Sequence, residues 1–586
     1  MKKTCDIVVI GGGGSGLVAG CRAADMGKQV IVLEKDPKTL GGGMNMASTM
    51  RTFGSKWQKE RDLPDTTMLY LRNRMDETYW RIDRKLAANV IRGTGWFFDW
   101  FEKIAPEKAA DFDVGRYVFD DPVDGPLGPQ SGGHGPGSKK GSGRIFVETC
   151  SEGIVARGGE ILQGVVTEKI VTEDGRVTGV IAKQGDEPIE IDCKAVILAC
   201  GSWIRNPEIV AKYYPMLAAA QPYMGESPHM NRNYTGDGLK LAEDAGALMD
   251  EENRTIRMMG PMTMCRSRVM SDMASSAYCI YVNRNGRRYI CEGSQMRMGV
   301  FDSGSVQLEQ PEGKVYVIFD ENTLARTLAD GDNQPQPQVP MPNMAGHFPA
   351  TLDDAHADMD PAIEKQDGVC FRADTVEALA EQINVDPAAL RETIDTYNRN
   401  CAEGMDWDCF KPSEWLVPMN QAPYYAVKAT LGTDGAFGGV EVDENMRVKA
   451  VSGGVVGGLY AAGDLASGRF LNMTGIKKQI INDMSFAVSS GFLAGSIGAN
   501  PVIVRNVMGK LKEAGILAVS QGRSGIELAR ALEEISFYDL YEALDCVSGE
   551  GLFHFHENPN AACPVGRNIH KAVDARLARV QRAMEA

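Results

Sequence analysis

Short apolar runs and one longer helical stretch open the chain. Residues 5–10 read CDIVVI, an apolar and largely β-branched run that is typical of a strand buried in a parallel sheet. Residues 17–26 are rich in alanine and stop before Gly27, which predicts a helix with a glycine stop. Residues 29–33 form a second apolar run that ends in Glu34. This order predicts a strand, a loop, a helix and a second strand.

The hydrophobic pattern changes period along the next 200 residues. Residues 46–110 carry apolar and charged positions at mixed spacing, which predicts mostly helices. Residues 160–200 alternate with a period of two and turn at a Glu-Asp-Gly sequence, which predicts a strand meander that ends in a buried strand at 195–199.

A pair of helices is predicted within residues 371–398. Asp374 and Glu377 have the spacing of a capping box at the start of the first helix, and Asp386 with Pro387 starts the second. Residues 330–368 are rich in Pro, Asp and Gln and predict an extended surface loop. Residues 501–586 predict a charged helical tail without a recognisable motif.

Length and charge narrow the class of protein. A chain of 586 residues is too long for one hydrophobic core, so we expect two or three domains. The net charge is −16 with acidic and basic residues interleaved, which disfavours nucleic acid or an anionic membrane as a partner. No apolar run reaches membrane-spanning length, and the first strand begins at once, so we expect no membrane span, no signal peptide and a cytoplasmic location.

The spacing of the cysteines and histidines does not indicate a metal site. The 13 cysteines include no C-x-x-C pair and no zinc or iron–sulfur spacing, so we expect buried, reduced thiols. His554 and His556 are close in sequence but would point apart on a strand and diverge on a helix. We therefore expect no metal site.

The loop after the first strand carries the clearest chemical signal. Residues 11–16 read GGGGSG and fit G-x-G-x-x-G. In such a loop Gly11 makes the tight turn, Gly13 lets the backbone approach a pyrophosphate, and Gly16 lets helix and strand pack closely. Glu34 follows at the distance at which a carboxylate bonds the ribose of the adenosine. The unit predicts a dinucleotide site.

A second glycine cluster at residues 41–45 (GGGMN) follows the acidic residue, as it does in flavoproteins, and favours FAD over NAD. With it, the chain resembles the fumarate reductase and ketosteroid dehydrogenase flavoproteins over residues 1–500. The resemblance rests on segments 41–45, 195–202, 235–238, 288–292, 371–398, 424–426, 438–443 and 457–464. Cys200 and Ser202 depart from the family's pattern after its buried strand.

The resemblance implies an α/β fold, in which a Rossmann-type FAD-binding domain carries an inserted α+β capping domain and a helical C-terminal tail. The expected boundaries are 1–274 and 419–500 for the FAD-binding domain, 275–418 for the capping domain and 501–586 for the tail. It also implies non-covalent FAD, because no His follows the second glycine cluster. The expected FAD-binding residues are Gly11, Gly13, Ser15, Gly16, Glu34, Lys35, Gly42, Gly43, Met44, Val166, Ala199, Gly201, Asp237, Gly463, Asp464 and Ser485. Asp237 has a simpler interpretation as a helix cap, and both roles are compatible.

Similarity to this family implies hydride transfer between flavin N5 and an activated carbon–carbon double bond of a small molecule. Fumarate reductases carry a His where Gly435, Ala436 and Phe437 stand, and an Arg in a segment that has none at 471–476. Fumarate is therefore not the expected substrate, and an enone or acrylate-like compound is. Tyr425, which matches a ketosteroid dehydrogenase tyrosine, is the candidate proton donor, and Arg297 is the candidate polarising group. The alternatives are aromatic packing for Tyr425 and a salt bridge for Arg297.

Two further readings stay open from the sequence. One is a ketosteroid-type dehydrogenase, and the other is a non-catalytic flavin-binding electron-transfer subunit. Only one G-x-G-x-x-G unit is present, so we expect an external electron donor: a partner flavoprotein, a cytochrome, a quinone or reduced flavin. Arg287 and Arg288 are expected to hold the capping domain in place rather than to contact the substrate.

Overall fold

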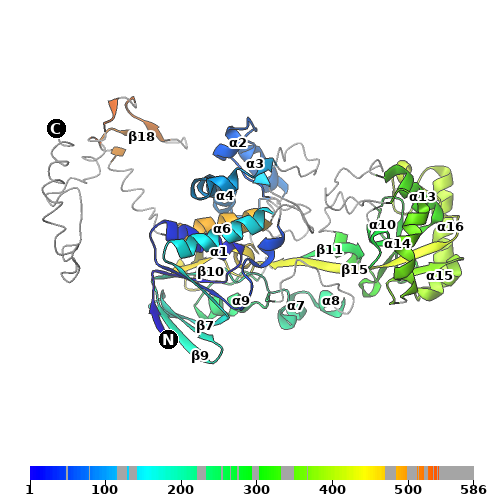
Figure 1. The fold of residues 1–586 in the computed structure, drawn as a ribbon, viewed down its shortest axis with the longest axis horizontal. Helices are drawn as coiled ribbons and strands as arrows, with labels where there is room; N and C mark the ends of the chain where they lie inside the picture. The colour runs from blue at the N-terminus through cyan, green and yellow to red at the C-terminus, as the bar shows by residue number, and fades with distance from the viewer. Residues whose placement is uncertain are drawn as a thin grey trace. The chain divides into compact units, whose positions relative to one another are not determined.

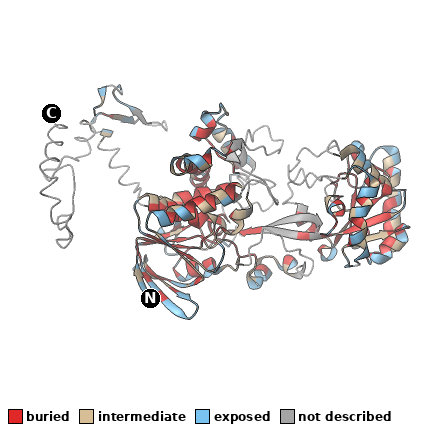
Figure 2. Ribbon diagram, in the orientation of Figure 1, coloured by how far each residue is buried: buried red, intermediate tan, exposed pale blue. Residues whose placement is uncertain are grey.

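Two compact units divide the chain in the computed structural model, residues 1–496 and residues 497–586. The structure describes residues 1–47, 50–77, 80–114, 129–130, 141–220, 233–251, 255–263, 265–273, 276–292, 303–331, 349–365, 367–468, 483–497, 511–512, 514–519, 526–531, 534–536 and 539. Figure 1 shows the elements, and Figure 2 shows where they are buried. The four-part domain division expected from the sequence stays a prediction.

A ten-stranded sheet in the first unit holds the N-terminal strands at its centre. Its parallel part runs in the order β17 (Val455–Ala461), β10 (Ala195–Leu198), β2 (Ile7–Ile10), β3 (Val30–Glu34) and β6 (Glu160–Gln163). All four residues of β2 and of β10 are buried, which is why these runs contain almost nothing but Val, Ile, Leu and Ala. The first three predicted elements are confirmed to within a few residues.

An antiparallel meander completes this sheet. It consists of β7 (Val165–Glu173), β8 (Arg176–Gln184) and β9 (Glu187–Asp192), with β1 (Lys2–Thr4) on its edge and β16 (Arg447–Lys449) beside β17. Asp174 and Gly175, both at positive φ, make the turn between β7 and β8 that the sequence predicts.

Helices that carry small residues cover the parallel strands. Figure 1 shows α1 (Gly14–Asp25) beside α6 (Ser142–Ala156) over one face of the sheet, with the meander on the other side. A Cβ added to Gly495, in α18 (Asp483–Gly495), would lie 2.3 Å from the carbonyl oxygen of Ala19. The glycines of α18 therefore permit its close packing against α1. Likewise, a Cβ on Gly93, in α4 (Arg84–Ile104), would lie 2.3 Å from Ser489 Oγ of α18.

A second, five-stranded antiparallel sheet lies in the same unit, and we call it, with the helices that cover it, the capping domain. Two of its strands, at residues 255–263 and 424–437, lie outside the expected bounds of 275–418. Its long strand β15 (Tyr424–Phe437) pairs with β13 (Val315–Asp320) on one edge, and β13 pairs with β12 (Ile280–Asn283). On the other edge β15 pairs first with β14 (Cys370–Ala373) and then with β11 (Thr255–Thr263). Because β13 and β11 both pair with Ala429, they lie on opposite edges of β15.

Side chains of the capping sheet alternate between two buried faces, as expected for strands with a period of two. Tyr281, Val317 and Tyr425 pack toward α10 (Arg268–Met273), α13 (Glu321–Asp330) and α14 (Leu352–Glu364). Ile280, Ile318 and Ala426 pack toward α15 (Val376–Gln382) and α16 (Pro387–Glu403). Helices therefore cover both faces of the sheet (Figure 2).

Two sequence predictions for the capping domain are wrong in detail. The residue that caps α15 is Thr375, whose hydroxyl accepts from Ala378 N, and Asp374 has no part in it. Residues 330–368 include α14 rather than only an extended loop. Its buried positions Ala355, Met359 and Ala362 form one face, so the apolar stripe outweighs the Pro and Asp content. The predicted start of α16 at Asp386 and Pro387 is confirmed.

The remaining elements connect these layers or belong to the second unit. They are η1 (Gly42–Met46), α2 (Lys56–Lys59), α3 (Thr67–Glu77), α5 (Pro106–Ala109), β4 (Asp113–Val114), β5 (Pro129–Gln130), α7 (Pro207–Tyr213), α8 (Pro215–Ala220), α9 (Asp237–Asp244), α12 (Ser303–Leu308), η3 (Pro311–Gly313), η5 (Ser413–Trp415), η6 (Gly463–Ala466), β18 (Leu517–Val519) and β19 (Ile526–Leu528). In the second unit β18 and β19 pair as an antiparallel hairpin, where the sequence predicted helix. Most of residues 501–586 lie outside the described residues.

Candidate functional site

The glycine loop at the N-terminus of α1 is as tightly packed as the motif requires. A Cβ on Gly11, which has φ +108°, would lie 2.3 Å from the carbonyl oxygen of Ala199. A Cβ on Gly16 would lie 1.9 Å from the carbonyl oxygen of Gly11. Both distances are far below contact, so these two glycines are required by the protein itself.

Gly13 is different from its neighbours. It precedes α1 with φ −72° and ψ 177°, a conformation open to any residue, and a Cβ built on it meets nothing within 4 Å. Open space therefore lies beside the N-terminus of α1, where free N–H groups and the helix dipole favour a negative group. A pyrophosphate seated there fits both features, so this chain's residues are suited to FAD.

The second glycine cluster is joined to the first. Gly41 N donates to Gly12 O at 2.7 Å, and Gly13 and Gly41 form an isolated parallel bridge. Gly41 has φ +92° and precedes η1, which carries Gly42, Gly43 and Met44. Met44 is buried against Gly14, since a Cβ on Gly14 would lie within 3 Å of its side chain. The two clusters thus form one backbone surface.

Glu34 lies at the end of β3, where its carboxylate holds backbone amides. Oε2 accepts from Gly12 N at 2.7 Å and Oε1 accepts from Asp36 N at 2.7 Å. The first bond ties the ribose-binding candidate directly to the glycine loop. It also gives the acid at this position a structural role that sequence spacing does not reveal.

A polar network beside Glu34 joins the start of the chain to residues 233–237. Lys35 Nζ donates to Asp237 Oδ2 and to Thr235 Oγ1, both at 2.6 Å. Asn233 Nδ2 donates to Asp36 Oδ2 at 2.8 Å. Hydrogen bonds from Lys38 N and Thr39 N outweigh burial and lower the pKa of Asp36 to about 2, so it carries a negative charge.

The helix-cap interpretation of Asp237 is wrong. The cap of α9 is Gly236, without a side-chain cap bond, and Asp237 instead pairs with Lys35. Sequence reasoning did not find Asn233 and Asp36, nor Tyr234, whose hydroxyl accepts from Gly43 N at 3.1 Å. No local signal marks them, because their partners are about 200 residues away in the sequence.

Ser15 connects the loop to the C-terminal part of the first unit. A Cβ on Gly463 would lie 2.5 Å from Ser15 Oγ, and Gly463 N donates to Ser490 Oγ at 3.0 Å. Ser485, also in α18, accepts from Arg51 N at 2.8 Å. The carbonyl oxygen of Asp464 accepts from Gly438 N at 2.8 Å. The first contact places Gly463 beside the start of α1, and the second ties Gly463 to α18. Asp464 and Ser485 remain predicted FAD-binding residues.

The other candidates near the adenosine half differ in their surroundings. Ala199 touches the glycine loop, since its side chain would lie 3.1 Å from a Cβ on Gly16. Gly201, with φ +72°, lies against the ring of Tyr234. Val166 is on β7, which contacts β3, and the residue is 40% exposed. All remain predicted FAD-binding residues.

The two residues that depart from the family's pattern have structural roles. Ser202 Oγ accepts from Ala436 N at 2.9 Å, and Cys200 Sγ donates to Ile10 O at 3.4 Å. Trp203 Nε1 donates to Gly438 O at 3.0 Å. The turn after β10 therefore holds the end of β15, where Ala436 and Phe437 are buried.

Tyr425, the candidate proton donor, lies in the core of the capping domain. Its ring is fully buried and stacks on Phe319, with centroids 5.0 Å apart. Its hydroxyl donates to Glu321 Oε2 at 2.9 Å and lies 3.3 Å from His356 Nε2. Burial and the Glu321 carboxylate raise the pKa of Tyr425 above its usual range. Arg297 lies outside the described residues, so both catalytic roles stay predictions.

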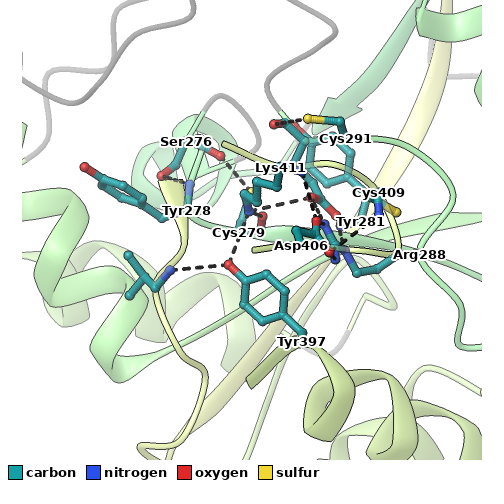
Figure 3. Close-up of polar contacts among 12 residues, drawn as sticks. Ser276, Tyr278, Cys279, Tyr281, Arg288, Cys291, Tyr397, Asp406, Cys409 and Lys411 are labelled. Atoms are coloured by element: carbon teal, nitrogen blue, oxygen red, sulfur yellow. Dashed lines mark hydrogen bonds and ion pairs between the residues drawn. The ribbon is translucent and has the colours of Figure 1, made fainter. Parts of the chain in front are cut away.

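A buried ionic cluster in the capping domain consists of Arg288, Glu292, Asp406 and Lys411. Figure 3 labels three of them, Arg288, Asp406 and Lys411. Arg288 pairs with Glu292 at 2.6 Å and with Asp406 at 2.8 Å, and no side chain of the four is more than 3% exposed. Lys411 Nζ lies 3.6 Å from Glu292 and donates to Cys279 O at 2.7 Å. Two positive and two negative groups thus balance. Both carboxylate partners of Arg288 lie within the capping domain, and its role in holding this domain in place stays a prediction.

Proton affinities in the ionic cluster follow from this pairing. Burial opposes charge on Asp406, but hydrogen bonds from Arg288 prevail and lower its pKa to about 2. Burial likewise opposes charge on Glu292, and the Arg288 and Lys411 charges still lower the pKa of that carboxyl. For Lys411 burial prevails and lowers the pKa of the ammonium. The four charged groups pair with one another, which favours a structural role for the cluster.

Comparison with known sequences agrees with the geometry of the glycine loop. The sequence model of a family described as FAD binding domain matches residues 6–474. A second model, described as an iron-dependent transcriptional regulator, matches residues 481–586. The second match covers a minor part of the chain and includes α18, which packs on α1.

Two curated relatives have low sequence identity to this chain but align with most of its length. The vinyl phenol reductase of Lactiplantibacillus plantarum is 26% identical over 479 residues, covering 79% of this chain and 90% of that protein. The NADH:acrylate oxidoreductase of Vibrio harveyi is 27% identical over 539 residues, covering 80% of this chain. The chain spans only 48% of that second protein's length.

Solved structures show the same fold. An open conformation of a flavocytochrome c3 fumarate reductase superposes with a TM-score of 0.62 at 23% identity, covering 84% of this chain and 78% of that one. The 3-ketosteroid delta1-dehydrogenase of Sterolibacterium denitrificans gives 0.61 at 21% identity, covering 84% and 99%. The predicted α/β fold class is thereby confirmed. Within the described residues, no helix is both long and apolar enough to cross a membrane.

Proposed function

Because the chain belongs to the FAD binding domain family and binds FAD, we propose that it is an oxidoreductase that reduces an activated carbon–carbon double bond. The substrate class is an enone or an acrylate-like compound. The observation that carries the proposal is the glycine loop. A side chain on Gly11 or Gly16 would overlap the protein's own atoms, whereas Gly13 faces open space. Bound FAD would supply hydride chemistry at its N5 atom.

This chain's residues would bind and orient the cofactor. The N-terminus of α1 would face the pyrophosphate, Glu34 would bond the ribose, and the Lys35–Asp237 pair would border the adenosine half. The buried α18 N-terminal half, with Ser485, would lie near the flavin half. The contacts of the loop support the assignments to the pyrophosphate and the ribose.

The substrate class is supported by the relatives and by the end of β15. The relatives named above are a vinyl phenol reductase and an acrylate oxidoreductase, and a 3-oxosteroid 1-dehydrogenase of Mycolicibacterium smegmatis is 24% identical over 560 residues. Gly435, Ala436 and Phe437 bring no cationic group to the end of β15, and Ala436 and Phe437 are buried. A clamp for the dicarboxylate fumarate therefore lacks support there, although fumarate reductases are among the relatives.

Anaerobic reoxidation tests the proposal directly. The FAD-loaded protein would be reduced with dithionite and mixed with a panel of a vinyl phenol, acrylate, a cyclic enone, a 3-oxo-4-ene steroid and fumarate. We expect the visible flavin spectrum to recover with at least one of the first three compounds and not with fumarate. Recovery with fumarate alone would overturn the substrate class.

A ketosteroid-type dehydrogenase is the second candidate function. It predicts that a saturated 3-oxosteroid bleaches the oxidised flavin and that a dye acceptor restores it. A non-catalytic electron-transfer subunit predicts that no compound of either panel changes the spectrum while dyes still exchange electrons with the flavin. The visible flavin spectrum therefore distinguishes the three candidate functions.

A further inference from the structure

In two pairs of described cysteines, the thiols lie close enough to change each other's pKa. One pair joins Cys21 of α1 to Cys150 of α6, and both residues are fully buried. The other joins Cys265 to Cys370 in the capping domain. Only the second pair has a partly exposed member, Cys265.

Strand register explains why the second pair forms. β14 and β11 lie on the same edge of β15, one after the other: Cys370 pairs with Val427, and Thr263 pairs with Ala429. The chain leaves β11 at Thr263, so Cys265 follows beside the start of β14. Both cysteines pack against the same buried cluster, which includes Met270 and Met359.

The surroundings of Cys265 favour its thiolate. Its Sγ lies 3.2 Å from Ser271 Oγ and 3.1 Å from Ser267 O. The hydrogen bond from the Cys370 thiol is the largest influence and lowers the pKa of Cys265 to about 7, although burial opposes it. For Cys370 the same bond and burial raise the pKa well above the usual range. Cys265 is thus suited to attack a disulfide first, and Cys370 to attack the mixed disulfide that results.

We propose that Cys265 and Cys370 form a dithiol that closes reversibly to a disulfide with a low-molecular-weight disulfide such as oxidised glutathione. The Cys265 thiolate attacks one glutathione sulfur, the S–S bond of glutathione breaks, and one glutathione thiolate leaves and takes up a proton. Cys370 then gives up its proton and attacks the Cys265 sulfur, and the second glutathione leaves. Two cysteine thiols lose two electrons in total, and one oxidised glutathione becomes two reduced ones.

The bond would join two segments that hydrogen bonds and packing alone now hold together. Cys265 belongs to the connection between β11 and α10, and Cys370 begins β14. A disulfide would fasten this connection to the sheet edge. The capping domain would thereby gain a covalent link that depends on the redox state. This inference is independent of the proposed substrate.

Peptide mapping of the full-length, FAD-loaded protein tests the proposal. The reduced protein would be incubated anaerobically with oxidised glutathione at neutral pH, blocked with N-ethylmaleimide and digested without reductant. We expect a linked peptide pair containing Cys265 and Cys370, which dithiothreitol reverses. We also expect no Cys21–Cys150 link, because those thiols are fully buried.

Three serine variants make the result specific, each checked for unchanged FAD content. Cys370→Ser should accumulate a stable glutathione adduct on Cys265, because the second attack is lost. Cys265→Ser should leave Cys370 unmodified, since Cys370 is 4% exposed. The control, Cys150→Ser, should form the link at the wild-type rate. A stable glutathione adduct on Cys265 in the wild type, without a link, would refute the proposal, as would equal rates of linking in both pairs.

Discussion

Gly13 is the residue at which the protein's own packing and the expected cofactor make different demands. A Cβ there meets nothing within 4 Å, whereas one on Gly16 would lie 1.9 Å from a carbonyl oxygen. Gly13→Ala should therefore change the free energy of unfolding by less than about 1 kcal/mol without FAD, because only an N-cap preference is involved. It should nevertheless weaken FAD binding at least about tenfold, which corresponds to about 1.4 kcal/mol.

Gly16→Ala is the matched comparison in the same loop. It should lower both the stability and the FAD content, because the new methyl group overlaps the backbone. Urea unfolding of the apoprotein and flavin titration measure the two quantities separately. Equal FAD affinity of Gly13→Ala and wild type would show that the open space beside Gly13 does not hold the pyrophosphate.

Tyr425 illustrates a residue whose motif position and surroundings point to different roles. Its hydroxyl already donates to the Glu321 carboxylate, so Tyr425→Phe should destabilise the protein by about 1.5–3 kcal/mol. Since the ring and its stacking are kept, we expect FAD content to be unchanged and kcat to fall less than about threefold. A loss of kcat of about a hundredfold or more, with FAD still bound, would instead support the proton-donor prediction.

Asp406 offers a residue-scale test of the buried ionic cluster. Asp406→Asn removes one partner of Arg288 and should cost about 3–5 kcal/mol of unfolding free energy. Asp408→Asn, at an exposed neighbour, should change it by less than about 1 kcal/mol. Urea midpoints of both variants measure the difference, and similar midpoints would contradict the importance of the pairing.

The same carboxyl makes stability depend on pH. Its pKa is lowered from 3.8 to about 2 in the folded protein, so its contribution is complete above pH 4 and is lost as the pH falls toward 2. The shift corresponds to about 2 kcal/mol, and the stability difference between wild type and Asp406→Asn should narrow in that window. A difference that stays constant from pH 5 to pH 3 would contradict the assignment.

At the scale of elements, the helix α15 shows how a cap is chosen. Asp374 and Thr375 are both capping residues by type, and the sequence prediction chose the capping-box spacing of Asp374 with Glu377. In the folded chain Glu377 instead pairs with Arg391 of α16, and the Thr375 hydroxyl accepts from Ala378 N. A long-range ion pair therefore removed one half of the predicted box.

This difference has a simple consequence for stability. Thr375→Ala should lower the free energy of unfolding by about 1 kcal/mol, because it removes the cap of α15. Asp374→Ala should change it by less than about 0.5 kcal/mol, since Asp374 is exposed. Chemical denaturation of the two variants under identical conditions decides between them, and a larger effect at Asp374 would restore the capping box.

Packing of α1 against α18 is another feature that only contacts between elements reveal. Gly491 and Gly495 are four residues apart on α18, and they lie against Ser15 and Ala19, also four residues apart on α1. Each spacing is visible in the sequence as small residues on one helix face. Their pairing is not, because the two helices are more than 450 residues apart in the chain.

At the scale of the whole molecule, the proposed function needs a source of electrons for the flavin. The sequence contains one G-x-G-x-x-G unit, and its loop is the one described beside α1. We propose that the donor is the one expected from the sequence: a partner flavoprotein, a cytochrome, a quinone or reduced flavin. Mixing the FAD-loaded protein with NADH under anaerobic conditions should therefore leave the flavin spectrum unchanged for minutes, whereas dithionite bleaches it. Rapid bleaching by NADH would refute the external donor.

The sequence by itself determined the parts of this protein that are local. Buried runs, turn residues and the glycine motif predicted the βαβ unit, the meander, the start of α16 and FAD, because each depends on neighbours within a few residues. Predictions from local sequence were wrong where a tertiary contact outweighs the local preference. Buried Ala355, Met359 and Ala362 make α14 a helix despite Pro361, and Lys35 takes Asp237 away from a capping role.

Only the tertiary structure decided which distant residues share a site. It joined Tyr234 to Gly43, Glu34 to Gly12, and Cys265 to Cys370. It also distinguished Gly11 and Gly16, beside which the protein leaves no room for a side chain, from Gly13, which faces open space. The physical reason is that the period of a pattern fixes an element and its buried face, whereas the partner of that face depends on how the whole chain packs.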